Sequence, residues 1–489
     1  MSTFFGKYDY VIVGAGTAGC VLANRLSANP THRVLLLEAG GKDDWIWIHI
    51  PVGYLYCIGN SRTDWCYRTE PCDGLNGRSI LYARGKVLGG CSSINAMIYM
   101  RGQALDYDAW AAGGNPGWSW NDVLPIFKHS EDHYLGASEI HGAGGEWRVE
   151  EQRLEWEILN AWRDAATQCG IPKVFDFNGG DNFGSARFQV NQRTGVRWNA
   201  SKGFLRPALS RTNLTVLTKV HATKIRFKLI DGRQQAVGIE FIRNNETYFA
   251  EASCETILAS GAINSPQLLQ LSGIGPGPLL AEHAITLVQE LAGVGENLQD
   301  HLELYLQYAC TQPVSLYPSL LWYNQPAIGA EWLFNGTGIG ASNQFEAGGF
   351  IRTREEFEWP NIQYHFLPVA INYNGSNGVK EHGFQAHMGS MRSPSRGRIQ
   401  LKSKNPRDYP SILFNYMATE QDWQEFRDGI RLTREIMQQP ALDQYRGREI
   451  SPGIEVQTDE QLDTFIREHA ETAFHPDHRH PRPQRQSAV

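Results

Sequence analysis

Three glycines near the N-terminus have the spacing of a dinucleotide site. An apolar strand beginning by Tyr8 leads into Gly14, Gly16 and Gly19, and a second apolar strand ends at Glu38. In such a unit the first glycine permits a tight turn, the second lets backbone approach a pyrophosphate, and the third lets the helix pack on the strand. Glu38 can accept hydrogen bonds from an adenosine ribose and would repel a 2′-phosphate. The pattern therefore favours FAD or NAD over NADP.

A second glycine-rich stretch, Gly85–Asn95, contains four small residues in a row at 89–92. Backbone of this kind can lie against a flat or anionic group, and the alternative is a tight packing turn. Histidines are the other candidates for chemistry, but 15 of them compete for few roles, so His475 alone would be taken for an ordinary histidine. His475, His478 and His480 lie in a basic, proline-rich tail without supporting ligands, and we predict no metal site there.

Composition excludes several classes of function. The 489 residues carry 45 Lys and Arg against 52 Asp and Glu, a formal net charge of −7, without a long basic block, which argues against nucleic-acid binding. No apolar run is long enough for a membrane span, and the early first strand leaves no room for a signal peptide, so a cytoplasmic protein is predicted. Eight scattered cysteines without a C-x-x-C pair predict reduced thiols.

The hydrophobic patterns predict an α/β chain (α+β overall), in which a Rossmann-like domain is interleaved with a domain built on an antiparallel sheet. Short β-rich pieces between Cys310 and Tyr416 form the expected antiparallel sheet. Strands are also expected at 214–218 and 256–259, and helices at 419–438 and 459–473. A short helix is expected to be capped by Ser265, with Pro266 as its first residue and Gly273 just after its end. A further helix is expected from the apolar positions Leu154, Ile158, Ala161, Trp162 and Ala165.

With these residues in view the chain resembles the glucose–methanol–choline (GMC) oxidoreductases. The resemblance is carried by Gly14–Gly19 with Glu38, by Gly85–Asn95, by Gly261–Gly275 and by Gly293–His301, and it extends to Pro476. It implies a FAD-binding domain in two parts, 1–135 and 196–309, a helical insertion at 136–195 and a substrate-binding domain at 310–476. A tail at 477–489 departs from the family.

The resemblance also implies a chemistry, the oxidation of an alcohol by hydride transfer to FAD, with His475 as the active-site histidine. Some members of the family link the flavin covalently through a histidine just before the asparagine at 95. This chain has Ile94 there, so non-covalent FAD is expected. The FAD-contacting residues that the resemblance implies are Gly14, Gly16, Gly19, Glu38, Val87, Gly90, Asn95 and Val220.

Segments after Asp300, such as 343–349 and 470–476, are similar to family members that oxidise choline to betaine aldehyde in glycine betaine synthesis. A trimethylammonium group should then lie against aromatic faces near a carboxylate. The candidates are Glu346, Phe345 and Phe474, and more widely Trp65, Trp322 and Tyr323. The expected electron acceptor is a membrane acceptor such as a quinone, or oxygen, and a peripheral position on the inner face of the cell membrane is implied by resemblance alone.

Other hypotheses stay open from the sequence. One is an aliphatic alcohol dehydrogenase of the same family, and a weaker one is an NAD-linked dehydrogenase. A third is an inactive, truncated flavin-binding fragment. Family members continue past Pro476 with a segment that carries a second active-site residue, Asn or His, and covers the cofactor, whereas the tail Asp477–Val489 has the character of an out-of-frame ending. On that basis we expect weak flavin retention, low stability and low activity.

Overall fold

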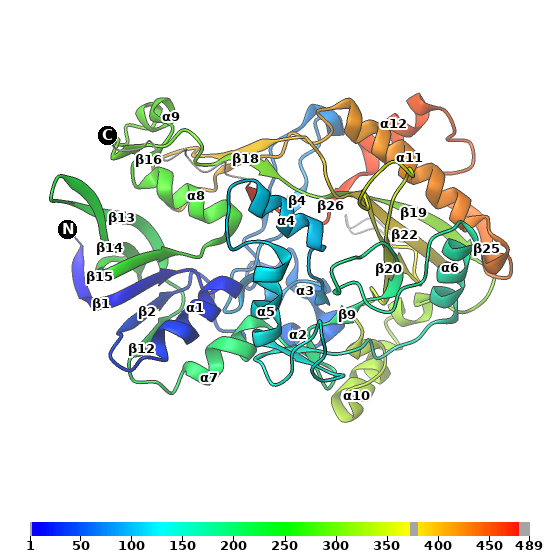
Figure 1. Cartoon of the computed structure of the whole chain (residues 1–489), viewed down its shortest axis with the longest axis horizontal. Coiled ribbons are helices and arrows are strands. Elements are labelled where there is room, and N and C mark those ends of the chain that lie inside the picture. Colours follow the sequence, from blue (N-terminus) through cyan, green and yellow to red (C-terminus); the bar gives the residue numbers. More distant parts are fainter. Residues whose placement is uncertain (1, 372–379, 479–489) are drawn as a thin grey trace.

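Two large β-sheets lie at opposite ends of the molecule in the computed structural model, which describes residues 2–371 and 380–478 (Figure 1). The first sheet, on the left in Figure 1, comes from the N-terminal strands and from residues 214–258. The second, on the right, comes from residues 302–472. The predicted α/β organisation, with a Rossmann-like unit and an antiparallel sheet, is confirmed. The exact domain boundaries stay a prediction.

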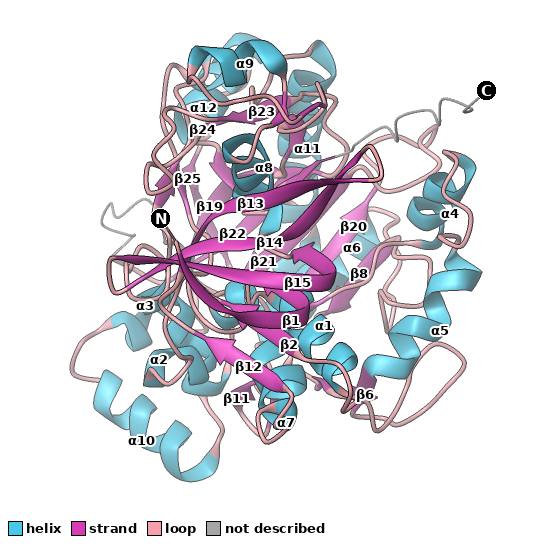
Figure 2. Ribbon diagram, turned by 90° about the vertical axis from the view of Figure 1, so that its left-hand side faces the viewer, coloured by secondary structure: helices cyan, strands magenta, loops and turns pink. Residues whose placement is uncertain are grey.

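The first sheet combines a parallel dinucleotide-binding half with an antiparallel hairpin. Its order is β12-β2-β1-β15-β14-β13; the first four strands run parallel and the last three are antiparallel neighbours. Figure 2 looks at this end of the molecule, where α1 (Thr17–Ser27) packs beside β1 and β2. The strands are β1 (Thr3–Val13), β2 (Val34–Leu37), β12 (Leu214–Leu217), β13 (His221–Ile230), β14 (Arg233–Arg243) and β15 (Glu246–Leu258).

The second sheet is antiparallel and runs in the order β20-β21-β22-β19-β25, with the short β26 also paired to β19. Its helices α6 and α11 pack on β21 and β22, as their buried apolar stripes predict. The strands are β19 (Leu302–Cys310), β20 (Ala347–Ile351), β21 (Ile362–Leu367), β22 (Gly383–Ser390), β25 (Arg446–Ser451) and β26 (Glu471–Thr472), and the helices are α6 (Glu157–Gln168), α11 (Glu420–Met437) and α12 (Asp459–His469).

A four-stranded sheet, β24-β23-β18-β27, joins the two ends. Its last strand, β27 (Asp477–His478), comes from the start of the tail that departs from the family in sequence, and these two residues pair with β18. Residues 479–489 of that tail lie outside the described residues. The other strands are β18 (Glu296–Gln299), β23 (Gly397–Gln400) and β24 (Ser411–Leu413).

Two predicted helix boundaries differ from the structure. Helix α8 (Gly261–Leu271) begins four residues before the predicted cap at Ser265, and Pro266 lies inside it. Pro266 has no N–H to donate, which would leave the carbonyl of Ala262 without its helical partner, but the Nε2 of His478 bonds to that carbonyl oxygen at 2.7 Å. The predicted helix end at Gly273 is confirmed, since this residue follows α8 with a φ of +87°.

The second difference concerns α12, which ends at His469 although the sequence predicts a helix to Ala473. The following residues leave the helix because they pair with β19 as β26. This pairing brings the chain to His475, so the shorter helix matters for the site.

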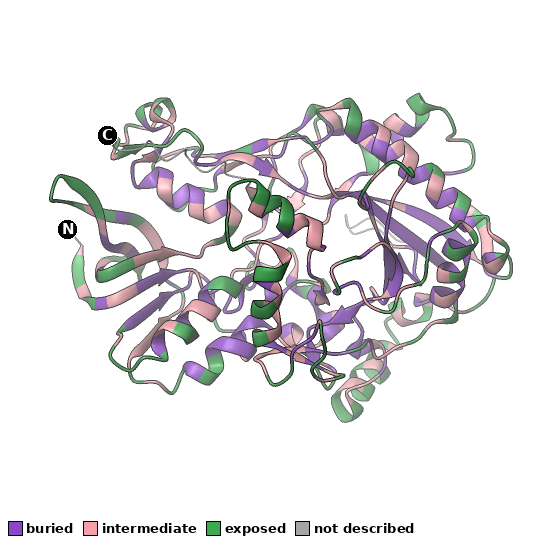
Figure 3. Ribbon diagram, in the orientation of Figure 1, coloured by how far each residue is buried: buried purple, intermediate pink, exposed green. Residues whose placement is uncertain are grey.

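Most of the remaining elements are short and connect the sheets. Buried residues, purple in Figure 3, cover most of the second sheet, whereas in the first sheet they include all of β2 and the end of β1 and only one residue of β13. Among the described residues no helix has the length and apolar character needed to cross the bilayer. These elements are α2 (Ile46–His49), α3 (Tyr54–Cys57), α4 (Ala104–Ala112), α5 (Trp120–Ser130), α7 (Arg206–Ala208), α9 (Gly277–Glu282), α10 (Gln325–Asn335), β3 (Tyr67–Arg68), β4 (Leu81–Tyr82), β5 (Ile98–Tyr99), β6 (Glu131–His133), β7 (Trp147–Val149), β8 (Gly184–Arg187), β9 (Gln189–Val190), β10 (Gln192–Arg193), β11 (Val196–Arg197), β16 (Ile274–Gly275) and β17 (Gln289–Glu290).

Candidate active site

The three N-terminal glycines have the backbone geometry that a dinucleotide cradle requires. Gly14 has a φ of +99°, and a Cβ there would lie 2.6 Å from the carbonyl oxygen of Ala259. A Cβ at Gly19 would lie 1.8 Å from the carbonyl oxygen of Gly14, so α1 packs closely on the turn. At Gly16 the nearest atom to a Cβ is 3.9 Å away, which leaves its backbone open to an approaching group.

Glu38 lies at the end of β2 and is buried. Its two carboxylate oxygens accept hydrogen bonds from the backbone N–H groups of Ala15 and Gly40, each at 2.8 Å. Burial raises the pKa of Glu38 to about 7, although the backbone donors oppose this shift. The carboxylate is therefore held at the edge of the cradle, where the ribose of a dinucleotide is expected.

A cavity of about 490 Å³ opens beside this cradle. Most of its lining belongs to the glycine turn, the start of α8 and the second glycine-rich stretch. A cavity of this volume with exposed backbone amides can hold a dinucleotide. Of the predicted cofactor-binding residues, Gly14, Gly16, Glu38, Gly90 and Val220 line it.

The second glycine-rich stretch packs directly on the first. The N–H of Gly89 donates to the carbonyl oxygen of Ala15 at 2.8 Å, and a Cβ at Gly90 would lie 2.7 Å from the Cα of Gly16. The two loops thus form one backbone surface, which supports close approach to a ligand over the alternative of an isolated packing turn.

Three predicted cofactor residues lie outside the cavity lining. Val87 is buried in a small apolar cluster with Ile48, Cys57 and Ile94. The Oδ1 of Asn95 accepts hydrogen bonds from the Nη1 of Arg197 at 2.8 Å and from the N–H of Met97 at 3.1 Å. Gly19 also lies outside the lining, behind the turn that it stabilises.

His475 lies on an exposed bend of the chain after β26. Its Nδ1 is 3.2 Å from the Nδ1 of His301, so one proton can be shared between the two rings and Nε2 of His475 is directed elsewhere. Although part of the His475 surface is exposed, the protein atoms packed around its ring, and secondarily His301 and His365, lower its pKa below the ordinary value. Its imidazole is therefore neutral at neutral pH and can accept a proton.

A carboxylate that the sequence did not single out lies near His475. Glu303 on β19 is 3.5 Å from the Nδ1 of His387 and 3.9 Å from the Nδ1 of His365, and Tyr305 donates its hydroxyl to it at 3.0 Å. Burial opposes ionisation of Glu303, but the two histidines outweigh it and lower its pKa to about 2. Glu303 pairs with Glu471 of β26, four residues before His475, so the strand with the ionised carboxylate lies beside the segment that leads to the histidine.

Register explains why this group forms. Strand pairing sets Tyr305 opposite His387 and His365 opposite His387 on neighbouring strands, and Glu303 precedes Tyr305 by two residues on the same face. Phe345 closes the group, with its ring 5.5 Å from that of His365 and 5.7 Å from that of His387. Polar residues at alternate positions of these strands could have indicated such a group in the sequence. The sequence alone, however, does not give the register in which the strands pair.

The predicted substrate residues separate into two sets. Phe345 faces the histidine group, and Phe474 packs near Tyr82, with ring centroids 5.9 Å apart. Glu346 is fully buried, its Oε1 is bonded by the hydroxyl of Ser342, and burial raises its pKa to about 7. None of its recorded partners belongs to the group around His475.

The three tryptophan and tyrosine candidates lie elsewhere. Trp65 lines the dinucleotide cavity and stacks on Tyr67, with ring centroids 5.6 Å apart. Trp322 and Tyr323 are 81% and 60% exposed, beside α10. Neither of these two exposed residues lines the cavity.

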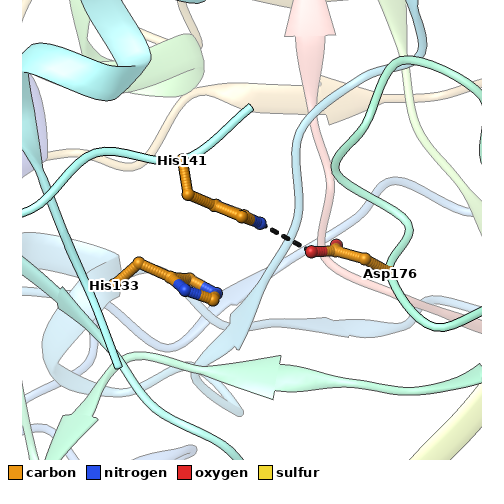
Figure 4. A group of neighbouring side chains, drawn as sticks. All are labelled: His133, His141 and Asp176. Atoms are coloured by element: carbon orange, nitrogen blue, oxygen red, sulfur yellow. Dashed lines mark hydrogen bonds and ion pairs between the residues drawn. The ribbon is translucent and has the colours of Figure 1, made fainter. Parts of the chain in front are cut away.

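A second histidine cluster, shown in Figure 4, consists of His133, His141 and Asp176. The rings of His133 and His141 stack, with centroids 3.7 Å apart, and the Nε2 of His141 is 2.6 Å from the carboxylate of Asp176. The Nδ1 of His141 bonds to Glu131, and Asp176 and Glu131 together raise the pKa of His141 to about 9 against the effect of burial. Stacked rings direct their nitrogen lone pairs in parallel, so the contacts favour a buried ion network over a metal site.

Comparison with known proteins agrees with this geometry. The N-terminal model described as GMC oxidoreductase matches residues 8–303, and the C-terminal model with the same description matches residues 393–476. The chain belongs to the GMC oxidoreductase family.

Individual relatives cover nearly the whole chain. It is 60% identical over 478 residues to a protein of Pseudomonas fluorescens named oxygen-dependent choline dehydrogenase, covering 96% of this chain and 83% of the relative. Among solved structures, pyridoxine 4-oxidase from Mesorbium loti matches with a TM-score of 0.86 and 29% identity, over 96% of this chain and 88% of that one. A FAD-dependent oxidoreductase from Chaetomium thermophilum matches with a TM-score of 0.86 and 27% identity, over 96% and 89%.

Proposed function

We propose that this GMC oxidoreductase oxidises choline to betaine aldehyde with FAD as its cofactor. The observation that supports this most is the pairing of β19 with β26, which brings the bend that carries the neutral His475 next to the strand that carries the ionised, largely buried carboxylate Glu303. The first can take the hydroxyl proton of an alcohol, and the second can hold a cation. The 60% identity to a protein named choline dehydrogenase points to the same substrate.

His475 is proposed as the residue that accepts the hydroxyl proton. Oxidation of the alcohol breaks its O–H and C–H bonds and forms the C=O bond of the aldehyde. The proton goes to Nε2 of His475, since Nδ1 faces His301. FAD, when bound, supplies the acceptor for the hydride. The bend after β26 is proposed to hold the histidine close to the substrate hydroxyl.

Glu303 is proposed to hold the trimethylammonium group. A carboxylate with a pKa of about 2 stays charged across the physiological range, and the rings of Tyr305 and Phe345 lie beside the same histidines. A desolvated cation gains from both a nearby carboxylate and aromatic faces. Glu303 replaces Glu346 in this role, because Glu346 is bonded to Ser342 in a separate buried environment.

FAD is proposed to bind in the 490 Å³ cavity without a covalent link. The open backbone at Gly16 fits the pyrophosphate, and Glu38 fits the adenosine ribose. Ile94, at the position where some family members carry a linking histidine, is buried and has no nucleophilic atom. A flavin that is released by acid precipitation of the protein would support this, and a flavin that stays with the precipitate would contradict it.

The acceptor of the electrons stays a prediction, either oxygen or a quinone at a membrane. The name of the Pseudomonas relative mentions oxygen. A membrane position is favoured by the residues around α10, where Trp322 and Phe334 are each 81% exposed and Leu333 is 67% exposed. Exposed aromatic residues of this kind partition into the membrane–water interface.

Product analysis tests the substrate. The purified protein, supplied with FAD and air, should convert choline to betaine aldehyde at a kcat/KM at least about tenfold above that for a medium-chain alcohol such as 1-hexanol. H475Q should lower kcat/KM by about 10²–10⁴-fold, the range expected for loss of a general base. Preference for hexanol would favour the aliphatic alcohol dehydrogenase hypothesis instead, and absence of any turnover with bound FAD would favour the inactive fragment.

A further inference from the structure

Asp300 is a buried carboxylate between β18 and β19, 6% exposed, and it has no part in the chemistry described above. It accepts three short hydrogen bonds. The hydroxyls of Tyr416 and Thr472 donate to Oδ2, each at 2.6 Å, and the N–H of His475 donates to Oδ1 at 2.7 Å. Two of these three donors belong to the segment that ends at the active-site histidine.

The segment from Thr472 to His475 adopts a backbone shape that needs such support. Phe474 has a φ of +62°, a left-handed conformation that costs a non-glycine residue free energy. The hydroxyl of Thr472 accepts the N–H of Phe474 at 2.8 Å, and Arg84 donates its Nη2 to the carbonyl oxygen of Phe474 at 2.6 Å. Asp300 is thus the acceptor that links the start and the end of a strained bend.

The residue after Asp300 holds the other side of the bend. The carbonyl oxygen of His301 accepts the N–H of Ala473 at 2.9 Å, and its ring nitrogen lies 3.2 Å from that of His475. Adjacent residues 300 and 301 therefore fix both the backbone and the ring direction of His475. A shift of Asp300 would move the imidazole of His475 relative to the substrate hydroxyl, which donates the proton.

We propose that Asp300 is a positioning residue, which fixes the imidazole of His475 in its reactive orientation by anchoring the Thr472–His475 bend. Asp300 touches no reacting atom and acts through His475, so the inference rests on the proposed function. Hydrogen bonds to a carboxylate are stronger and shorter than neutral ones, which suits a clamp of a strained segment. An amide at this position accepts with one oxygen only and presents an NH₂ group to donors.

D300N tests the proposal through the rate of flavin bleaching by choline, measured per bound flavin in anaerobic stopped flow. We expect this rate to fall by about 10–100-fold, the loss associated with a misplaced catalytic group, while KM for choline changes less than about threefold. The decisive measurement is the double variant D300N/H475Q, which should be no slower than H475Q alone if Asp300 acts through the histidine. A wild-type rate in D300N, or losses that multiply in the double variant, would overturn the proposal.

T472V is the second variant, in case D300N fails to fold or to hold flavin. It removes the donor from the bend and leaves Asp300 in place, and we expect about a tenfold lower bleaching rate. Y416F is its matched partner, because it removes a donor to the same oxygen from outside the bend, and it should lose less than T472V. Equal rates for T472V and Y416F would contradict the proposal.

The controls separate this inference from the proposed function. If H475Q bleaches as fast as the wild type, the role of His475 fails, whatever D300N does. If H475Q is slow and D300N is fast, the role of His475 stands and the positioning role of Asp300 fails.

Discussion

The Glu38 carboxylate shows how the surroundings of one side chain set its use. It accepts two backbone N–H groups at the edge of the cradle, yet burial raises its pKa to about 7. The glutamate at the end of the second strand could be predicted from the sequence, because the glycine spacing and the two strands fix its place. Its raised pKa could not, since burial depends on Gly40, Val220 and the other segments that close over it.

FAD affinity should depend on pH through Glu38. Ribose hydroxyls donate to the ionised carboxylate, and a group whose pKa is about 7 without FAD is mostly protonated at pH 6 and mostly ionised at pH 8. Affinity should therefore rise about tenfold between pH 6 and pH 8, measured by quenching of flavin fluorescence. E38Q should bind FAD more weakly and lose this pH dependence, whereas E251Q, which alters a partly exposed ion pair with Lys7, should keep it. A pH dependence that persists in E38Q would contradict this assignment.

Glu303 should determine the choice of a cationic substrate. E303Q removes the charge with little change of shape, so KM for choline should rise by about 10–100-fold, the value of a charge-assisted contact at a desolvated site. The matched control is 3,3-dimethylbutan-1-ol, which has the shape of choline without its charge, and its KM should change less than about threefold. Equal effects on both alcohols would show that Glu303 supports the fold and does not bind the cation.

Elements whose ends are set by local chemistry agree with the sequence, and those set by distant contacts do not. Helix α11 has its capping residue at Thr419 and its end near Gln438, as predicted. Helix α8 starts early because the imidazole of His478, more than 200 positions along the chain, bonds to the carbonyl that Pro266 leaves free. Helix α12 stops early because β19 and Asp300 capture the residues after it.

The glycine turn between β1 and α1 should be necessary for FAD binding but not for folding. G16A places a methyl group where no described protein atom lies closer than 3.9 Å, so the variant should fold with a melting temperature within a few degrees of wild type. The methyl group should nevertheless block the approach of the pyrophosphate and weaken FAD binding by about 100-fold or more, measured by fluorescence titration. G41A is the control, since its Cβ also meets only ordinary contact, at 4.0 Å, and it does not line the cavity. Unchanged FAD affinity in G16A would contradict the placement of the cofactor.

Across the whole molecule, the site is assembled from segments that are far apart in the sequence. Glu303, His387 and the bend that carries His475 come together because β19 pairs with β22 on one side and with β26 on the other. The family resemblance predicts His475 as the active-site histidine, while the placement of Glu303 and His387 depends on an antiparallel register that alternation alone leaves open. The fold class was thus predictable, the cofactor-binding residues stay a prediction, and the composition of the proposed substrate group could not be predicted.

The exposed residues around α10 make a prediction for the molecule as a whole, since α10 lies at its lower edge in Figure 1. Binding to phosphatidylglycerol–phosphatidylcholine vesicles, measured by co-sedimentation, should fall more than about tenfold in W322S/F334S, because two large apolar side chains leave the interface. L229S is the control, as Leu229 is 69% exposed on the β13–β14 hairpin at the other end. Equal binding by both variants would exclude α10 as the membrane contact.

The central claim is that FAD bound to this chain is reduced by choline, and an anaerobic absorbance spectrum before and after addition of choline tests it most directly. We expect an oxidised flavin band that choline bleaches in the wild type and bleaches at least about 100-fold more slowly in H475Q. A flavin band that choline leaves unchanged would contradict the proposed substrate. A protein that shows no flavin band even with added FAD would contradict the cofactor site itself.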